Sequence, residues 1–480
     1  MTRPHFIWLS RCMALLAASS GAVLAGCGGG SSAEGPQPAP MSAVTVMAAS
    51  AGNDRVSQFV LSVNFLSLTN QSGTTIDVIA SPKNVEFVHL NGNLAPLATV
   101  SIPQGVYVSA TLTVGGGYTC VALNPNGGLL ESEFGGSSFN AAVLFPQPVT
   151  ISGPQSHLVL SLLSAQSALF SSCTGVYSAQ GSPAPSTSLM PTFTISADTQ
   201  AQQAFSLSGL VSSLDAAAGQ FSLTTDFGIT WPVRAAGATV YQGIAGLPSL
   251  AAGMAVDMDV TIAPDGSLSA MRVAVPDTST VNLSAFRGPA VFVDTNASSI
   301  GLGPPVAWGQ WVALAGSTSG PAYLDVSTTL YQISGRLRNL GSLPFTPAFN
   351  ANTLVPGQNV YVTNHALVLS GPGYSPASTV TLMPQTIDGT VVGVAQSGGF
   401  AVYTVALAPY DLFPTLAVQP AQTSQLQNPS TVVVYADSGT QMLNTAPVAN
   451  GGVLRFNGLV FNDNGTLRMD CAQVLDGVAP

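Results

Sequence analysis

The stretch that decides the fold runs from residue 102 to residue 114 and reads IPQGVYVSATLTV. After its proline and glycine, apolar residues recur at every second position up to Val114. The same alternation recurs over residues 59–65 and 158–162. Because successive side chains of a strand point to opposite faces, each segment predicts a strand with one buried face. Turn signals separate these strands, so the sequence predicts an all-β fold that begins with an antiparallel β-sandwich over residues 51–195.

The first residues of this stretch also carry a family resemblance. Ile102-Pro103-Gln104-Gly105-Val106-Tyr107 resembles the IPxGxY element of an uncharacterised bacterial lipoprotein family, domain of unknown function 4382. The resemblance extends over about residues 45–195 and implies a transthyretin-like sandwich. Pro103 cannot continue a ladder, Gly105 is able to take a positive φ, and Tyr107 begins the next strand.

A repeated pattern of short strands follows the sandwich. We expect three β-repeat modules at residues 205–280, 284–385 and 386–480, the middle one being divergent. Each has a glycine turn before its fourth strand and a hairpin before its fifth, as at Asn464-Gly465. The pattern resembles the tandem repeats called domain of unknown function 5666. Five such strands could close as a small OB-like barrel without exposed edges, or all units could join in one continuous sandwich.

The N-terminus predicts secretion and lipid anchoring. Residues 1–26 combine Arg3 and Arg11 with an uncharged apolar run that is too short to span a bilayer, as in a signal peptide. Leu24-Ala25-Gly26-Cys27 resembles the lipobox of bacterial lipoproteins, which implies a thioether-linked diacylglycerol on Cys27. Gly28 is not a retention aspartate, which favours the outer membrane if the organism is Gram-negative. Residues 27–50, rich in Gly, Ser and Pro, predict a flexible tether.

Composition limits the partners. Charged residues make up only 7% of the chain, and loss of Arg3 and Arg11 leaves nine basic and 21 acidic side chains. Lys83 is the only lysine. Such a surface cannot neutralise phosphates, so we expect no nucleic-acid partner. The expected partners are the membrane, through Cys27, and an extracytoplasmic protein or polysaccharide.

Catalytic and metal-binding motifs are absent from the sequence. There is no G-x-S-x-G elbow and no H-E-x-x-H pair, and His89, His157 and His365 occur in separate segments as expected surface or turn residues. We therefore expect no catalytic residues, no metal and no cofactor. Asn462-Asp463-Asn464-Gly465 predicts a hairpin turn in preference to a calcium loop.

One pair of carboxylates could be read as a glycosidase pair. Asp257 and Asp259 alternate with Val256, Met258 and Val260 in a predicted strand, so both lie on one face. The same alternation is typical of a half-buried strand with a solvated outer face. We expect the solvated face.

Tryptophans and cysteines supply the remaining candidates. Trp231, Trp308 and Trp311 could stack on sugar rings, and Trp308 and Trp311 form the densest pair. Core packing is nevertheless the usual fate of a tryptophan in a small barrel and is expected here. Cys120 and Cys173 both fall in the predicted sandwich and are expected to form a disulfide in an oxidising compartment. Cys471 is then left as a buried thiol, or it pairs with one of the other two cysteines.

Two functions from different classes fit these observations. The first is a non-catalytic, lipid-anchored cell-envelope protein whose β-modules have binding, adhesive or structural roles. The second is a carbohydrate-binding or glycosidase-accessory surface lipoprotein, for which Trp308, Trp311 and the Asp257/Asp259 pair are the motivating residues. Nothing in the sequence favours a soluble metabolic enzyme.

Overall fold

The computed structural model confirms the all-β prediction, since nearly all of its regular structure consists of strands. It describes residues 39–476 apart from 52–55, 88–89, 91–93, 116–117, 124–128, 135–137, 164–190, 198–204, 226–228, 264–266, 281–283, 296–297, 303–305, 310–321, 336–339, 365–374, 408–410, 418–424 and 444–445. Within these residues, no helix has the length and apolar character needed to cross a membrane.

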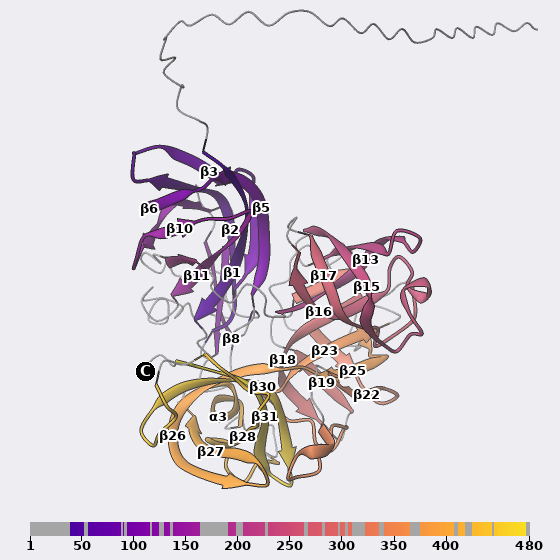
Figure 1. Cartoon of the computed structure of the whole chain (residues 1–480). Coiled ribbons are helices and arrows are strands. Elements are labelled where there is room, and N and C mark those ends of the chain that lie inside the picture. Colours follow the sequence, from indigo (N-terminus) through magenta and orange to yellow (C-terminus); the bar gives the residue numbers. More distant parts are fainter. Residues whose placement is uncertain are drawn as a thin grey trace, which may run out of the picture. The chain divides into compact units, whose positions relative to one another are not determined.

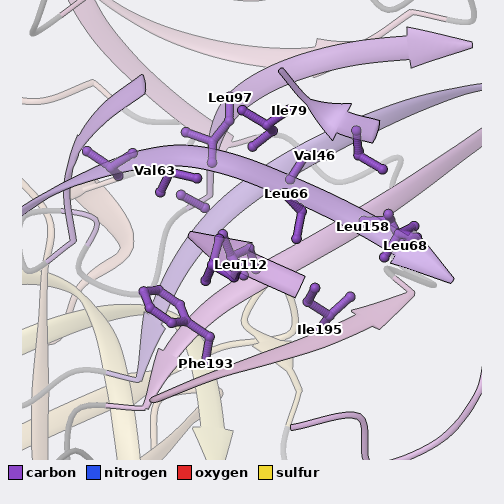
Figure 2. Close-up of a cluster of buried hydrophobic side chains, with 14 of the residues drawn as sticks. Val46, Val63, Leu66, Leu68, Ile79, Leu97, Leu112, Leu158, Phe193 and Ile195 are labelled. Atoms are coloured by element: carbon purple, nitrogen blue, oxygen red, sulfur yellow. The ribbon is translucent and has the colours of Figure 1, made fainter. Parts of the chain in front are cut away.

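The N-terminal strands form two layers with one core between them (Figure 1). They are β1 (Met41–Ala51), β2 (Val56–Asn70), β3 (Thr75–Ile79), β4 (Lys83–Glu86), β5 (Ala95–Pro103), β6 (Gly105–Val114), β7 (Tyr118–Leu123), β8 (Leu129–Phe134), β9 (Phe139–Leu144), β10 (Val149–Ile151), β11 (Gln155–Leu163) and β12 (Thr192–Ala197). One layer holds β5, β1, β11 and β12, the other is built around β2 and β6, and β9 pairs with both. Figure 2 shows Val46 and Leu158 facing Leu66 and Leu112 across the core.

This sandwich differs from the prediction in two respects. Two of its pairings, β1 with β11 and β12 with β9, are parallel. Residues 41–50, which we assigned to the flexible tether, belong to strand β1, where Val44, Val46 and Met47 are fully buried. Apolar alternation within this short segment, and not its Pro/Gly-rich surroundings, decides its structure.

The IPxGxY element turns the chain from β5 into β6. Pro103 ends β5 and Gly105 begins β6. Tyr107 is buried, and its hydroxyl donates a hydrogen bond to the carbonyl oxygen of Pro103 at 2.8 Å. This arrangement is similar to a tyrosine corner, in which a buried tyrosine ties a strand to the backbone upstream. Gly105 does not adopt the positive φ that we allowed for, since its backbone lies outside the left-handed region.

A closed five-stranded barrel follows, here called the first barrel. Its strands are β13 (Phe205–Asp215), β14 (Gln220–Thr224), β15 (Thr230–Gln242), β16 (Ala255–Ile262) and β17 (Leu268–Ala274), with a 3₁₀ turn at Leu247–Ser249. They pair in the order β13-β14-β15-β17-β16, with only β15 and β17 parallel. Trp231 is buried in its core, as predicted.

The C-terminal strands, which form the third predicted module, repeat this order. We call the ring that they form the third barrel. Its elements are β26 (Gln385–Ser397), β27 (Phe400–Leu407), α3 (Leu412–Ala417), β28 (Thr431–Ala436), β29 (Gln441–Met442), β30 (Val453–Asp463) and β31 (Thr466–Asp476). The parallel pairing of β28 with β31 closes the ring β26-β27-β28-β31-β30. Asn464 and Gly465, both with positive φ, make the predicted hairpin turn between β30 and β31.

Between the two barrels lies the middle module. It contains β18 (Ser284–Asp294), β19 (Ser299–Leu302), β20 (Val306–Gly309), β21 (Ala322–Asp325), β22 (Leu330–Ile333), a 3₁₀ turn at Leu340–Ser342, β23 (Asn359–Asn364), β24 (Ser375–Pro376) and β25 (Thr379–Leu382). Its third and fifth strands are each interrupted, as β21 with β22 and β24 with β25. Allowing for these interruptions, its pairings follow the same order and again include the parallel contact between third and fifth strands.

One backbone contact recurs in all three modules. In each module, the glycine turn before the fourth strand exchanges two backbone hydrogen bonds with a bulge in the first strand. The turn and bulge residues are Gly253–Met254 with Val211, Gly357–Gln358 with Ala290, and Gly451–Gly452 with Val391. Gly253, Gly357 and Gly451 all have positive φ, between 85° and 100°. The predicted glycine turns are therefore needed for backbone geometry, and they hold the ring at the same place in each module.

Gly209 and Gly237 of the first barrel provide a matched test of its packing. A Cβ at Gly209 would collide with the carbonyl oxygen of Thr224, whereas one at Gly237 meets nothing within 4 Å. We expect Gly209→Ala to destabilise the first barrel by about 1–3 kcal/mol, as overpacking does. Gly237→Ala should change stability by no more than about 0.5 kcal/mol. Urea denaturation followed by tryptophan fluorescence measures both, and equal midpoints would contradict the close approach of β13 to β14.

Candidate functional site

Asp257 and Asp259 are not on a solvated face, so that prediction is wrong. Val256, Met258 and Val260 point into the first barrel, and the two aspartates lie on the opposite face of β16 as expected. Each aspartate is nevertheless only 4% exposed. Neighbouring strands add polar side chains to this outer face, namely Ser206 and Ser208 from β13 and Arg272 from β17. The outer face over β13, β16 and β17 is therefore polar and buried.

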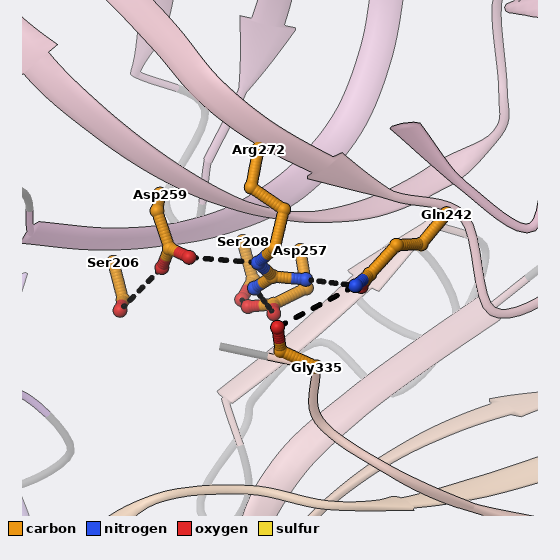
Figure 3. A network of polar contacts seen from close by, with 7 residues as sticks. All are labelled: Ser206, Ser208, Gln242, Asp257, Asp259, Arg272 and Gly335. Atoms are coloured by element: carbon orange, nitrogen blue, oxygen red, sulfur yellow. Dashed lines mark hydrogen bonds and ion pairs between the residues drawn. The ribbon is translucent and has the colours of Figure 1, made fainter. Parts of the chain in front are cut away.

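Arg272 holds the two aspartates together (Figure 3). Its Nη2 lies 2.5 Å from Asp257 Oδ2 and its Nε lies 2.7 Å from Asp259 Oδ2. The other carboxylate oxygens accept hydrogen bonds from the hydroxyls of Ser208, at 3.1 Å, and Ser206, at 3.4 Å. Nη1 of Arg272 donates to Gln242 Oε1 at 3.1 Å. We call Asp257, Asp259 and Arg272 the ion triad.

Arg272 keeps its charge. Burial alone lowers the pKa of Arg272, but the charges of Asp257 and Asp259 and their hydrogen bonds outweigh it and raise that pKa above its usual range. Burial, followed by the charge of Asp257, likewise raises the pKa of Tyr361 above its usual range, so Tyr361 stays a neutral phenol. Arg272 therefore stays a cation and Tyr361 a neutral phenol over the whole physiological pH range.

The surface that covers the ion triad belongs to the middle module, and it is the equivalent face of that module. Strand register makes Tyr361, Thr379 and Thr381 the counterparts of Asp257, Arg272 and Ala274. Gln332 is likewise the counterpart of Gln242. The two glutamines reach across in opposite directions, Gln242 donating to Gly335 O at 3.4 Å and Gln332 donating to Pro276 O at 3.3 Å. The two repeats thus meet through equivalent faces, although these two hydrogen bonds are not equivalent to each other.

A cavity of about 510 Å³ lies between these two faces. Pockets for small molecules usually have volumes of about 300–1,000 Å³. Both repeats supply its lining, which consists of Gln242, Gly243, Asp257, Arg272, Ala274, Val275, Pro276, Asp277, Thr278, Leu330, Gln332, Ile333, Ser334, Gly335, Tyr361, Ser378, Thr379 and Thr381. Most of its polar groups are hydroxyls and amides. Asp257 and Arg272 of the triad therefore lie in one wall of a partly open space that has both polar and apolar lining groups.

Two hydroxyls in this lining have no partner among the described residues. Ser334 is 5% exposed and Thr381 is 7% exposed, and neither hydroxyl oxygen makes a hydrogen bond there. Other lining groups are engaged, since Asp277 Oδ2 accepts from Thr363 at 3.2 Å and Asp277 Oδ1 accepts from the Ser279 amide at 2.9 Å. Buried hydroxyls without partners are uncommon in native proteins.

Several residues predicted as sites from the sequence lie wholly or partly outside the described residues. Trp308 lies in β20, whose backbone pairs with β18, but its side chain, like the whole of Trp311, is outside the described residues. Cys120 lies in β7, and Cys173 is outside the described residues. Cys27 also lies outside them. The sugar-stacking pair, the disulfide and the lipid anchor therefore stay predictions.

The structure also describes Cys471 and His157, about both of which the sequence makes predictions. Cys471 is a buried thiol whose Sγ donates to the carbonyl oxygen of Gln473 at 3.2 Å. His157, expected at the surface or in a turn, is buried in β11, where its Nε2 lies 3.0 Å from the side-chain amide of Gln155. Within the part of the chain that the structure describes, no three His, Cys, Asp or Glu side chains gather in a way that could hold a metal ion.

Comparison with known proteins adds no further assignment. The chain matches no protein-family model, and a search of curated proteins finds no similar sequence. The resemblances to domains of unknown function 4382 and 5666 therefore rest on the motifs quoted above. The functional argument rests on the site itself.

Breaking the ion triad should be costly, whereas replacing it should not. Arg272→Met leaves two buried carboxylates without their cation, and we expect it to lower the free energy of unfolding by about 3–5 kcal/mol. The triple variant Asp257→Leu, Asp259→Leu, Arg272→Met keeps the volume without the charges and should recover most of this loss. Arg455→Met, at an exposed hydrogen bond to the backbone of Asp476, is the matched control. Chemical denaturation measures all three, and an Arg272→Met midpoint equal to that of Arg455→Met would show that the triad is not buried.

Proposed function

We propose that this chain is a non-catalytic, lipid-anchored protein of the bacterial cell envelope whose β-modules serve to bind a partner. One observation carries the binding role: a cavity of about 510 Å³ between two repeats, in whose wall Asp257 and Arg272 are fixed by their own ion pairs. Preorganised polar groups reduce the ordering that a ligand must otherwise cause, which favours recognition. An adhesive or structural role for the remaining modules is compatible with this proposal.

The ion triad supports binding over catalysis. A glycosidase pair needs one carboxyl group that keeps its proton and room for the sugar between the two groups. Between Asp257 and Asp259 lies the guanidinium group of Arg272, which contacts both carboxylates and occupies the space that a sugar would need. General acid catalysis by either aspartate would require this arginine to leave. The pair is therefore better suited to hold a shape than to transfer a proton.

The membrane address rests on the N-terminal sequence. In this proposal residues 1–26 are removed as a signal peptide, Cys27 receives the acyl groups, and Gly28 favours the outer membrane of a Gram-negative cell. The segment between Cys27 and the first residue of β1, Met41, tethers the folded modules. We further propose that the sandwich and the repeats belong to the two families that their motifs resemble.

Substitution of Cys27 tests the anchor. We expect wild-type protein expressed in a Gram-negative host to enter the detergent phase of a phase-separation assay and to incorporate labelled palmitate. Cys27→Ala should lose the label completely and leave the membrane fraction, because no thiol remains to receive the lipid. Ser32→Ala, in the same segment, is the control and should behave as wild type. Unchanged labelling and fractionation of Cys27→Ala would overturn the lipid anchor.

A further inference from the structure

We propose that the sheet edge at β22, beside the cavity between the first barrel and the middle module, binds an extended polypeptide segment of a partner protein. The segment would add to this edge as a further strand. It would carry apolar residues at every second position and basic residues in preference to acidic ones. This proposal rests on the binding role given above and names the kind of partner. Three features carry it: the unpaired backbone of β22, the lining of the cavity and its one partly exposed charged residue.

Strand β22 is the end strand of the middle module's sheet, and its backbone is paired on one side only. Among the described residues it pairs with β25 and with no other strand. The amides of Leu330 and Ser334 donate to backbone oxygens on the β25 side, each at 3.0 Å, so alternate residues of β22 are directed to β25. The N–H and C=O groups of Tyr331 and Ile333 point the other way, where no described residue bonds to them. Such a row of unpaired backbone groups matches the backbone of an added strand.

The cavity reaches this edge of the sheet. The inner strand β25 lines it with alternate residues only, Thr379 and Thr381, as a strand does when one of its faces borders a space. The end strand lines it with a continuous run, residues 332–335. Ile333 belongs to this run although its side chain packs against the core of the middle module, so the cavity meets the backbone of β22 there. A strand added at β22 would therefore lie against the cavity.

The lining favours apolar side chains on one face of the added strand. Leu330, at the start of β22, is 58% exposed, and Ile333, Val275 and Pro276 also line the cavity. An exposed leucine on an uncharged end strand is a feature that proteins usually avoid, because lysine, proline or a bulge normally protects a sheet edge. Side chains alternate between the two faces of a strand, so every second residue of the partner would contact this lining.

The charged residues of the cavity favour a basic segment over an acidic one. Asp257 and Arg272 are buried and paired with each other, whereas Asp277 is partly exposed. Asp277 accepts hydrogen bonds from the Thr363 hydroxyl and the Ser279 amide, which fix its position. A basic residue that flanks the apolar positions would find a carboxyl partner here, and an acidic residue would not.

The hydrogen bonds that cross the cavity are weak enough to yield to an added strand. Gln242 donates to Gly335 O at 3.4 Å and Gln332 donates to Pro276 O at 3.3 Å. Both distances exceed the usual N–H···O range of about 2.7–3.2 Å. Both donors are side-chain amides, which can rotate away without a change in the backbone. Entry of a strand therefore loses little hydrogen bonding within the chain.

The test uses peptide probes and the full-length, detergent-purified chain. The basic probe is acetyl-Lys-Thr-Val-Thr-Val-Thr-Lys-amide, and the acidic probe has Glu in place of both lysines. Two further versions of the basic probe are N-methylated, one at both valines and the other at all three threonines. Because the backbone groups of successive residues point to opposite edges of a strand, each version loses the donors of one edge. Fluorescence anisotropy measures binding, and hydrogen exchange with mass spectrometry measures protection of β22.

Two variants locate the binding site. Leu330→Lys places a charge on the edge, as natural sheet edges do. Met442→Lys, at an apolar residue that is 49% exposed in β29 of the third barrel, is the matched control. Both substitutions replace exposed side chains, so both should leave the melting temperature of the free chain nearly unchanged.

We expect the basic probe to bind, and to bind more tightly than the acidic probe. Binding should slow hydrogen exchange in the fragment that contains the amides of Tyr331 and Ile333. One N-methylated version should bind like the basic probe and the other should not bind, because only one edge of the added strand contacts β22. Leu330→Lys should weaken binding of the basic probe about tenfold, and Met442→Lys should leave it unchanged.

Five results would overturn the proposal: no binding of the basic probe, equal or tighter binding of the acidic probe, binding without protection of β22, equal binding of the two N-methylated versions, or binding that Leu330→Lys leaves intact. None of these results affects the membrane partitioning of Cys27→Ala. A failed anchor with normal peptide binding would contradict the lipid anchor alone. A normal anchor without peptide binding would contradict the edge site alone.

Discussion

The contact between the first two repeats depends on the guanidinium group of Arg272, which is held by Asp257 and Asp259. A fully buried cation is tolerable only when its partners are in place, because its hydration has been lost. Both partners come from the same barrel, so that barrel brings its charged groups to the contact already paired with one another. The middle module then has to cover this face without adding charge, and it does so with Tyr361, Thr379 and Thr381. The cavity is the space that remains between these two faces, and its lining is both polar and apolar.

The three modules keep one backbone design while their outer faces diverge. A positive-φ glycine before the fourth strand and a bulge in the first strand recur in each, with the same pair of hydrogen bonds. Side chains that point into a barrel must fill it, which restricts them to apolar residues. Side chains on the outer face are restricted only by what covers them. Equivalent outer positions therefore carry Arg272 in the first barrel, Thr379 in the middle module and Gln473 in the third barrel.

Local patterns in the sequence predicted most of the fold. Alternation located the strands, and the Asn464-Gly465 turn and the glycine turns lie where they were expected. Parallel pairings such as β1 with β11 could not be predicted, because they join segments more than 100 residues apart. The burial of Asp257 and Asp259 was missed for a related reason, since alternation gives the face of a residue but not what packs on that face. A signal was nevertheless present: Arg272 lies between Met271 and Val273 in a chain with few basic residues, and a cation in such a strand needs an acidic partner.

A contact between two equivalent faces is complete once it has two members, whereas a head-to-tail contact can propagate along a filament. The first barrel and the middle module use the same face against each other, so this contact has no free copy with which to recruit another repeat. The third barrel is attached in another way, through Leu459 and Phe461, which pack into the core cluster of the middle module. The modules are thus not interchangeable units of a solenoid, in which repeats can be added or removed at will. The number of modules is set because the first barrel and the middle module close as a pair and the third barrel docks separately.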